Sequence, residues 1–139
     1  MTALSARDVS RLTGVHRDLV RVVNRATSAF PGKFIVVEGL RTKARQAELF
    51  AQGRTKPGKV VTWTLNSKHI EGLAVDLCPV KADGSLDWTN IPAFDRMGAA
   101  VLQAAKELGV AVRWGADWDR DGKLREKGES DSPHFEIVE

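Results

Sequence analysis

The apolar run LAVDLC at residues 73–78 constrains this chain more than any other stretch, because it holds one carboxylate, Asp76. A charge inside such a strand is costly to bury unless it is paired or bound to a cation. His69 lies shortly before this run, and Gly72 between them allows a backbone turn. A neutral imidazole and a carboxylate are both good zinc ligands. The alternative is a turn histidine and a strand-end aspartate that both face solvent.

A second histidine of the same kind stands near the other end of the chain. His134 begins the apolar run at residues 134–138, and Asp131 lies three residues before it. His69, Asp76 and His134 together make a set of two histidines and one carboxylate, and a catalytic zinc needs three protein ligands plus an open position for water. Asp131 is then left over as a general base close to the metal.

Two motifs carry a resemblance to known proteins. Residues 67–76 match the pattern S-x-H-x-x-G-x-A-x-D without departure, and residues 131–134 match a late acid-x-x-H element. Together they resemble the zinc peptidases that include D-alanyl-D-alanine carboxypeptidases and dipeptidases, hedgehog-type domains, and phage endolysins that cut between L-alanine and D-glutamate. The chain length and the segments 38–42 and 114–118 look most like the endolysins.

The resemblance implies roles for two more residues. Arg41 follows the strand expected at residues 34–37, where the resembling peptidases place an arginine that binds substrate and stabilises the oxyanion. Ser67 would hydrogen-bond the substrate or the site. The alternatives are a surface arginine that caps a turn and a plain turn serine.

The zinc set predicts a hydrolytic mechanism without a covalent intermediate. Zinc lowers the pKa of bound water to about 7, and Asp131 would take a proton from that water and return it to the leaving amine. Arg41 and the metal would stabilise the oxyanion. The single cysteine, Cys78, lies in an apolar run and is expected to be a small core residue.

Hydrophobic spacing predicts a small α+β domain, with helices packed on a mainly antiparallel sheet. One helix is expected from Ser5 to about residue 28 with His16 on its surface, a second after Thr42, and a third from Asn90 to Gly109. The expected strands are at residues 34–37, 73–80 and 110–114.

Residues 117–122 match the D-x-D-x-D-G opening of a calcium loop. Asp117, Asp119 and Asp121 are therefore candidate calcium ligands. The glutamate usual at the twelfth loop position is replaced by Gly128, although glutamates flank it. A solvated acidic turn is the alternative.

Length and charge set the remaining expectations. The 139 residues are expected to form one domain, 1–139, without a separate cell-wall-binding domain, and a monomer. Residues 1–70 hold 13 Lys and Arg against 4 Asp and Glu, whereas residues 71–139 hold 8 against 14. The basic half suits an anionic envelope polymer, or is simply a solvated basic helix face, and no nucleic-acid motif is present.

The sequence therefore predicts a zinc peptidase acting on the peptide stem of bacterial peptidoglycan. By resemblance it is an endolysin that cuts the L-alanyl-D-glutamate bond and lyses the host. With no membrane span and no signal core at the N-terminus, it is expected in the host cytoplasm, reaching the cell wall by another route. The alternatives are a D-alanyl-D-alanine carboxypeptidase and a non-catalytic hedgehog-like zinc domain that only binds.

Overall fold

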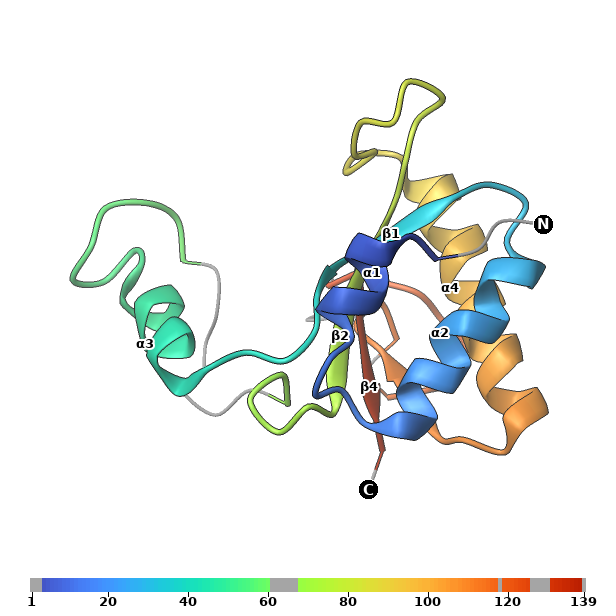
Figure 1. Ribbon diagram of the computed structural model, residues 1–139. Helices are drawn as coiled ribbons and strands as arrows, with labels where there is room; N and C mark the ends of the chain where they lie inside the picture. Colours follow the sequence, from blue (N-terminus) through green and yellow to red (C-terminus); the bar gives the residue numbers. More distant parts are fainter. Residues whose placement is uncertain (1–3, 61–67, 118, 126–130, 139) are drawn as a thin grey trace.

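The computed structural model describes residues 4–60, 68–117, 119–125 and 131–138 (Figure 1). The described helices and strands, in chain order, are α1 (Ala6–Arg11), α2 (Arg17–Ala29), β1 (Phe34–Glu38), α3 (Lys43–Ala51), β2 (Ala74–Pro79), α4 (Ile91–Leu108), β3 (Val112–Trp114) and β4 (His134–Ile137).

The strands form one antiparallel sheet in the order β1-β2-β4-β3, which confirms the predicted α+β fold. β2 and β4 occupy its centre, and their register places Asp76 opposite His134 and Val75 opposite Phe135. Side chains alternate between the two faces of a strand. One face of these strands is therefore apolar, whereas the other carries the carboxylate and the histidine.

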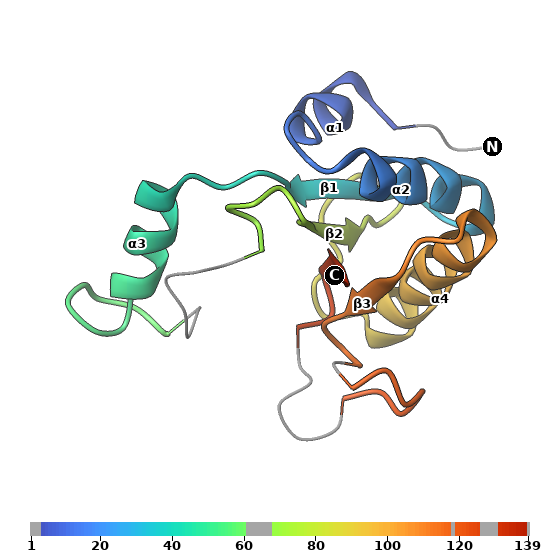
Figure 2. The ribbon, with the colours of Figure 1, turned by 90° about the horizontal axis from the view of Figure 1, so that it is seen from below.

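The apolar face packs against helices α2 and α4, which lie side by side (Figures 1 and 2). Trp114 on β3 stacks on Phe135 with ring centroids 5.9 Å apart. The helices contribute a shared set of fully or almost fully buried side chains: Leu19, Val22, Val23, Phe94, Met97 and Val101.

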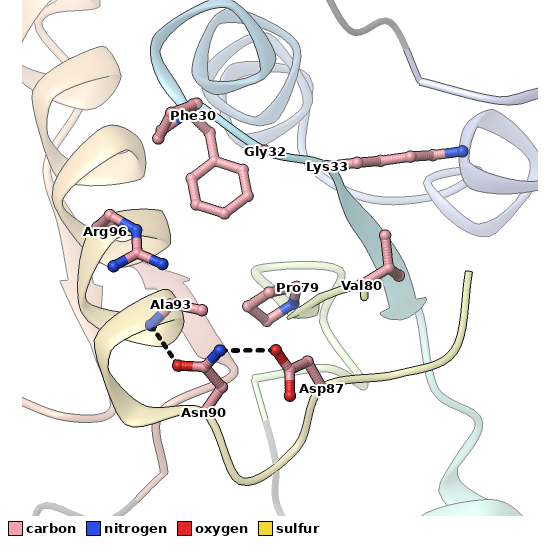
Figure 3. A pocket seen from close by; sticks show the side chains of 10 residues that line it. Phe30, Gly32, Lys33, Pro79, Val80, Asp87, Asn90, Ala93 and Arg96 are labelled. Carbon is pink, nitrogen blue, oxygen red and sulfur yellow. Dashed lines mark hydrogen bonds between the residues drawn. The ribbon is translucent and has the colours of Figure 1, made fainter. Parts of the chain in front are cut away.

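Helix α4 follows the sequence expectation closely. Asn90 accepts a hydrogen bond from the Ala93 N–H at 3.1 Å and donates to Asp87 at 2.8 Å (Figure 3). Gly109 ends the helix in the left-handed conformation, with φ of 69°. Cys78 is buried, as expected, and burial raises the pKa of its thiol to about 11.

The single N-terminal helix expected from Ser5 to about residue 28 is wrong. The chain breaks after α1, passes through Gly14 at φ of 84°, and restarts at His16, whose ring accepts the Asp18 N–H. His16 is therefore a helix cap, and its own N–H donates to the Gly72 carbonyl at 2.7 Å. The break lets the chain bend around the turn that leads into β2, a long-range contact that local spacing does not encode.

Helix α3 stands apart from the rest of the domain (Figures 1 and 2). Thr42 caps it as predicted, by accepting the Arg45 N–H at 3.0 Å. Gln46 is its buried residue. No helix among the described residues is long and apolar enough to cross a membrane.

Gly72 lies where the turn before β2 approaches the segment between α1 and α2 closely. A β-carbon there would lie 2.3 Å from the Gly14 carbonyl oxygen at φ of 72°, whereas Gly84, at φ of 87°, has nothing within 4 Å. The left-handed conformation costs an alanine roughly 1–2 kcal/mol at either position. Gly72→Ala should therefore lower the free energy of unfolding by clearly more than Gly84→Ala does, as measured by denaturant titration. Equal losses would contradict the close approach.

Candidate metal centre

The three predicted zinc ligands converge on the polar face of the sheet. Asp76 lies on β2, His134 begins β4, and His69 lies in the turn before β2. Their ligand atoms all lie within 4.8 Å of one another. Residues far apart in the sequence thus meet because β2 pairs with β4 and the turn at Gly72 folds back.

Each histidine turns one ring nitrogen toward Asp76 and the other toward a second acceptor. Nε2 of His69 is 3.2 Å from Asp76 Oδ1, and its Nδ1 is 2.8 Å from the Gly39 carbonyl oxygen. Nδ1 of His134 is 3.4 Å from the same Asp76 oxygen, and its Nε2 is 2.8 Å from Glu136 Oε1. Two nitrogens and one oxygen therefore converge, which is a donor set suited to zinc.

The electrostatics of the cluster favour a bound cation. Burial alone raises the pKa of Asp76, but hydrogen bonds to His134 and His69 outweigh it and hold the pKa well below the usual range. Burial alone lowers the pKa of His134, whereas the Asp76 and Glu136 carboxylates raise it to about 9. Without a metal, a proton on His134 offsets this concentration of negative charge.

Asp131 lies beside the ligands, as the sequence predicts for a base. Its Oδ2 is 3.9 Å from His134 Nδ1, and its side chain remains 53% exposed. Burial raises the pKa of Asp131, and the negative charge of Asp76 acts in the same direction. The positive charges of His134, His69 and Arg41 act in the opposite direction but do not outweigh the burial. A β-carbon at Gly115 would lie 2.1 Å from the Asp131 carbonyl oxygen, so this glycine permits the close packing of the segment.

Arg41 also reaches the site. Its Nη2 is 3.9 Å from Asp76 Oδ2, its Nε donates to Glu38, and its Nη1 donates to Gln46 at 2.7 Å. The guanidinium is therefore held at the edge of the metal cluster. Ser67, the other predicted substrate contact, lies outside the described residues.

Sequence reasoning missed the side chains that surround the predicted ligands. Glu136 contacts His134, and Glu38 and Gln46 hold Arg41. The signal for Glu136 was present, because residues two apart on a strand share a face. Gln46 carried no such signal, since a glutamine on a separate helix resembles an ordinary surface residue.

The predicted calcium residues form a second acidic group. Oxygens of Asp117, Asp119 and Asp121 lie within 4.8 Å of one another. Asp117 is buried and accepts the Gly122 N–H at 2.9 Å, whereas the other two aspartates are exposed. Burial and side-chain hydrogen bonds to its two neighbours raise the pKa of Asp117, against the backbone donors. The glutamates flanking position 128 lie outside the described residues.

A separate pocket opens at the N-terminal end of β1, away from the histidine cluster (Figure 3). It is lined in part by Phe30, Lys33, Pro79 and Arg96, and it contains none of the predicted site residues.

Three side chains that could hold a metal ion, with a carboxylate and an arginine beside them, form the arrangement typical of metal-dependent hydrolases. A family profile described as phage L-alanyl-D-glutamate peptidase matches residues 1–138. The chain belongs to this peptidase family, in agreement with the predicted resemblance.

Individual relatives carry the same description. The chain is 37% identical over 134 residues to the L-alanyl-D-glutamate peptidase of Escherichia phage T5, a match that covers 92% of each protein. It is 36% identical over 110 residues to the peptidoglycan L-alanyl-D-glutamate endopeptidase CwlK of Bacillus subtilis (strain 168). That second match covers 75% of this chain and 60% of CwlK.

Solved structures show the same architecture. The Serratia marcescens L-Ala D-Glu endopeptidase ChiX superposes with a TM-score of 0.79 at 35% identity, over 99% of this chain and 90% of that one. The vancomycin-resistance D,D-dipeptidase VanXYg gives a TM-score of 0.57 at 20% identity, over 89% of this chain and 50% of its own. The second likeness shows a shared fold alone.

His134 makes the stability of the metal-free protein depend on pH. Its pKa rises from an ordinary 6.5 to about 9 in the folded chain, so its proton stabilises the fold fully below about pH 6.5. That contribution should be lost as the pH rises through about 9. Denaturant unfolding in the presence of a metal chelator gives the free energy of unfolding of each protein. The wild type should be more stable than His134→Gln at low pH, and this difference should shrink between about pH 6.5 and 9. An advantage that grows with pH would contradict the assignment.

Proposed function

We propose that this chain is a zinc-dependent peptidoglycan endopeptidase that hydrolyses the L-alanyl-D-glutamate bond of the peptide stem and so lyses host bacteria. The observation that carries the proposal is the convergence of His69, Asp76 and His134 beside the Asp131 carboxylate. The names of the phage T5 and Serratia relatives support the choice of bond.

The three ligands would hold zinc, which supplies a Lewis acid and lowers the pKa of water to about 7. Asp131 accepts a proton from the attacking water and later returns it to the leaving amine. The Asp131 carboxylate is 3.9 Å from His134 Nδ1, close to the proposed metal ligands, which supports this role. Arg41, held by Glu38 and Gln46, donates to the developing oxyanion.

The basic surface supports a role in reaching the substrate. Lys43, Arg45, Lys56 and Lys59 lie on the exposed arm formed by α3 and the loop after it. We infer that this arm attracts anionic envelope polymers over a range set by ionic strength. The domain would act as a monomer on the bacterial cell wall.

We also propose that calcium binds at Asp117, Asp119 and Asp121. The missing twelfth-position glutamate predicts weak binding, with a dissociation constant of about 10⁻⁵–10⁻³ M. Calorimetric titration of the zinc-loaded protein should show this binding, and Asp117→Asn should reduce it. The absence of heat at millimolar calcium, together with unchanged lysis, would rule the site out.

Asp131→Asn tests the mechanism, because asparagine keeps the shape of the side chain but cannot accept the proton. Hydrolysis of purified peptidoglycan should fall by about 10²–10⁴-fold, with about one zinc per chain retained. His134→Ala should lose zinc as well as activity. Mass analysis of wild-type digests should show new N-terminal D-glutamate.

Three outcomes would contradict the proposal. Asp131→Asn with full zinc content and wild-type turnover would exclude it as the base. Released D-alanine in place of N-terminal D-glutamate would indicate a D-alanyl-D-alanine carboxypeptidase. Peptidoglycan that stays intact when incubated with the zinc-loaded wild-type protein would indicate a hedgehog-like domain that only binds.

A further inference from the structure

Glu136 is a buried carboxylate on the metal-binding face to which the reaction assigns no role. It is 5% exposed and lies two residues after His134 on β4, so both side chains share one face. The register places it opposite Ala74 on β2 and Arg113 on β3. A buried carboxylate is costly unless it is paired.

Both oxygens of Glu136 face specific partners. Oε1 is 2.8 Å from His134 Nε2, and Oε2 is 3.7 Å from Nη1 of Arg113. An ionised carboxylate only accepts hydrogen bonds, so the ring nitrogen beside it must carry the proton. The proton on Nε2 leaves the lone pair of the neutral ring on Nδ1, the nitrogen that faces Asp76 at 3.4 Å.

In the neutral form that a metal ligand requires, the two histidines would therefore be opposite tautomers. His69 gives its Nδ1–H to the Gly39 carbonyl and turns Nε2 toward the cluster. His134 does the reverse, and its acceptor is a charged side chain instead of the backbone. Ala74, which lies across from Glu136 on β2, has no polar group that could replace it.

We propose that Glu136 is a positioning residue that selects Nδ1 of His134 as the metal-binding atom, with Arg113 holding the Glu136 carboxylate in place. This role rests on the proposed metal centre and adds Glu136, the residue behind the His134 ring. A carboxylate behind a ligating histidine fixes the ring orientation and makes the ring a stronger donor. Loss of such a partner typically weakens metal affinity by about 10–100-fold.

Two substitutions separate this role from general support of the fold. Glu136→Ala removes the acceptor and should weaken zinc binding by about 10–100-fold. Glu136→Gln can still accept from Nε2–H through its amide oxygen, so it should restore most of the affinity. Asp8→Asn is the matched control, since Asp8 is also buried at 2% exposure but accepts the Val36 N–H at 2.9 Å, away from the cluster.

The measurement is the zinc dissociation constant of each folded protein, obtained by competition with a chromophoric chelator. Circular dichroism reports folding. Nitrogen-15 NMR of the zinc-loaded wild type identifies which ring nitrogen of His134 carries the proton. We expect the proton on Nε2, wild-type-like affinity for Asp8→Asn, and affinities that fall from wild type through Glu136→Gln to Glu136→Ala.

Zinc bound through Nε2 of His134 in the wild type would overturn the inference, whether or not the alanine variant folds. Unchanged zinc affinity in a folded Glu136→Ala protein would also overturn it, while leaving the metal centre intact. A wild type that binds no zinc would instead overturn the metal centre and this inference together.

Discussion

The pairing of β2 with β4 is the constraint on which the rest of the structure depends. It sets the Asp76 carboxylate opposite His134 in the middle of the sheet, where a lone charge would be costly. Both histidines turn a ring nitrogen toward Asp76 Oδ1, so the buried charge is compensated by the groups that can also share a cation with it. The pair that meets across these two strands is thus also the core of the candidate metal centre.

The same strands serve two purposes because their side chains alternate. On one face Val75 and Phe135 pack into the helical core, and on the other Asp76 and His134 meet. A register slip of one residue would exchange these faces and place the carboxylate in the core. Glycine at position 115 lets the segment bearing Asp131 pack tightly against the sheet edge, so the candidate ligands and the proposed base lie on neighbouring parts of one sheet.

Much of this arrangement could be predicted from local sequence. The charge in an apolar run identified Asp76, and the capping residues of α4 set its start and end. The break between α1 and α2 could not be predicted, because it follows from a contact between His16 and Gly72 that lies far along the chain. The contact of Gln46 with Arg41 could not be predicted either, since it depends on where α3 lies. Glu136 was missed although its spacing from His134 on one strand places both on the same face.

We propose that two histidines and one aspartate hold a zinc ion through particular atoms. Anomalous diffraction from zinc-soaked crystals, recorded on both sides of the zinc absorption edge, tests it most directly. We expect one strong peak, bound by His69 Nε2, His134 Nδ1 and a carboxylate oxygen of Asp76. A peak confined to the acidic loop at Asp117, or none at the histidine cluster, would contradict it.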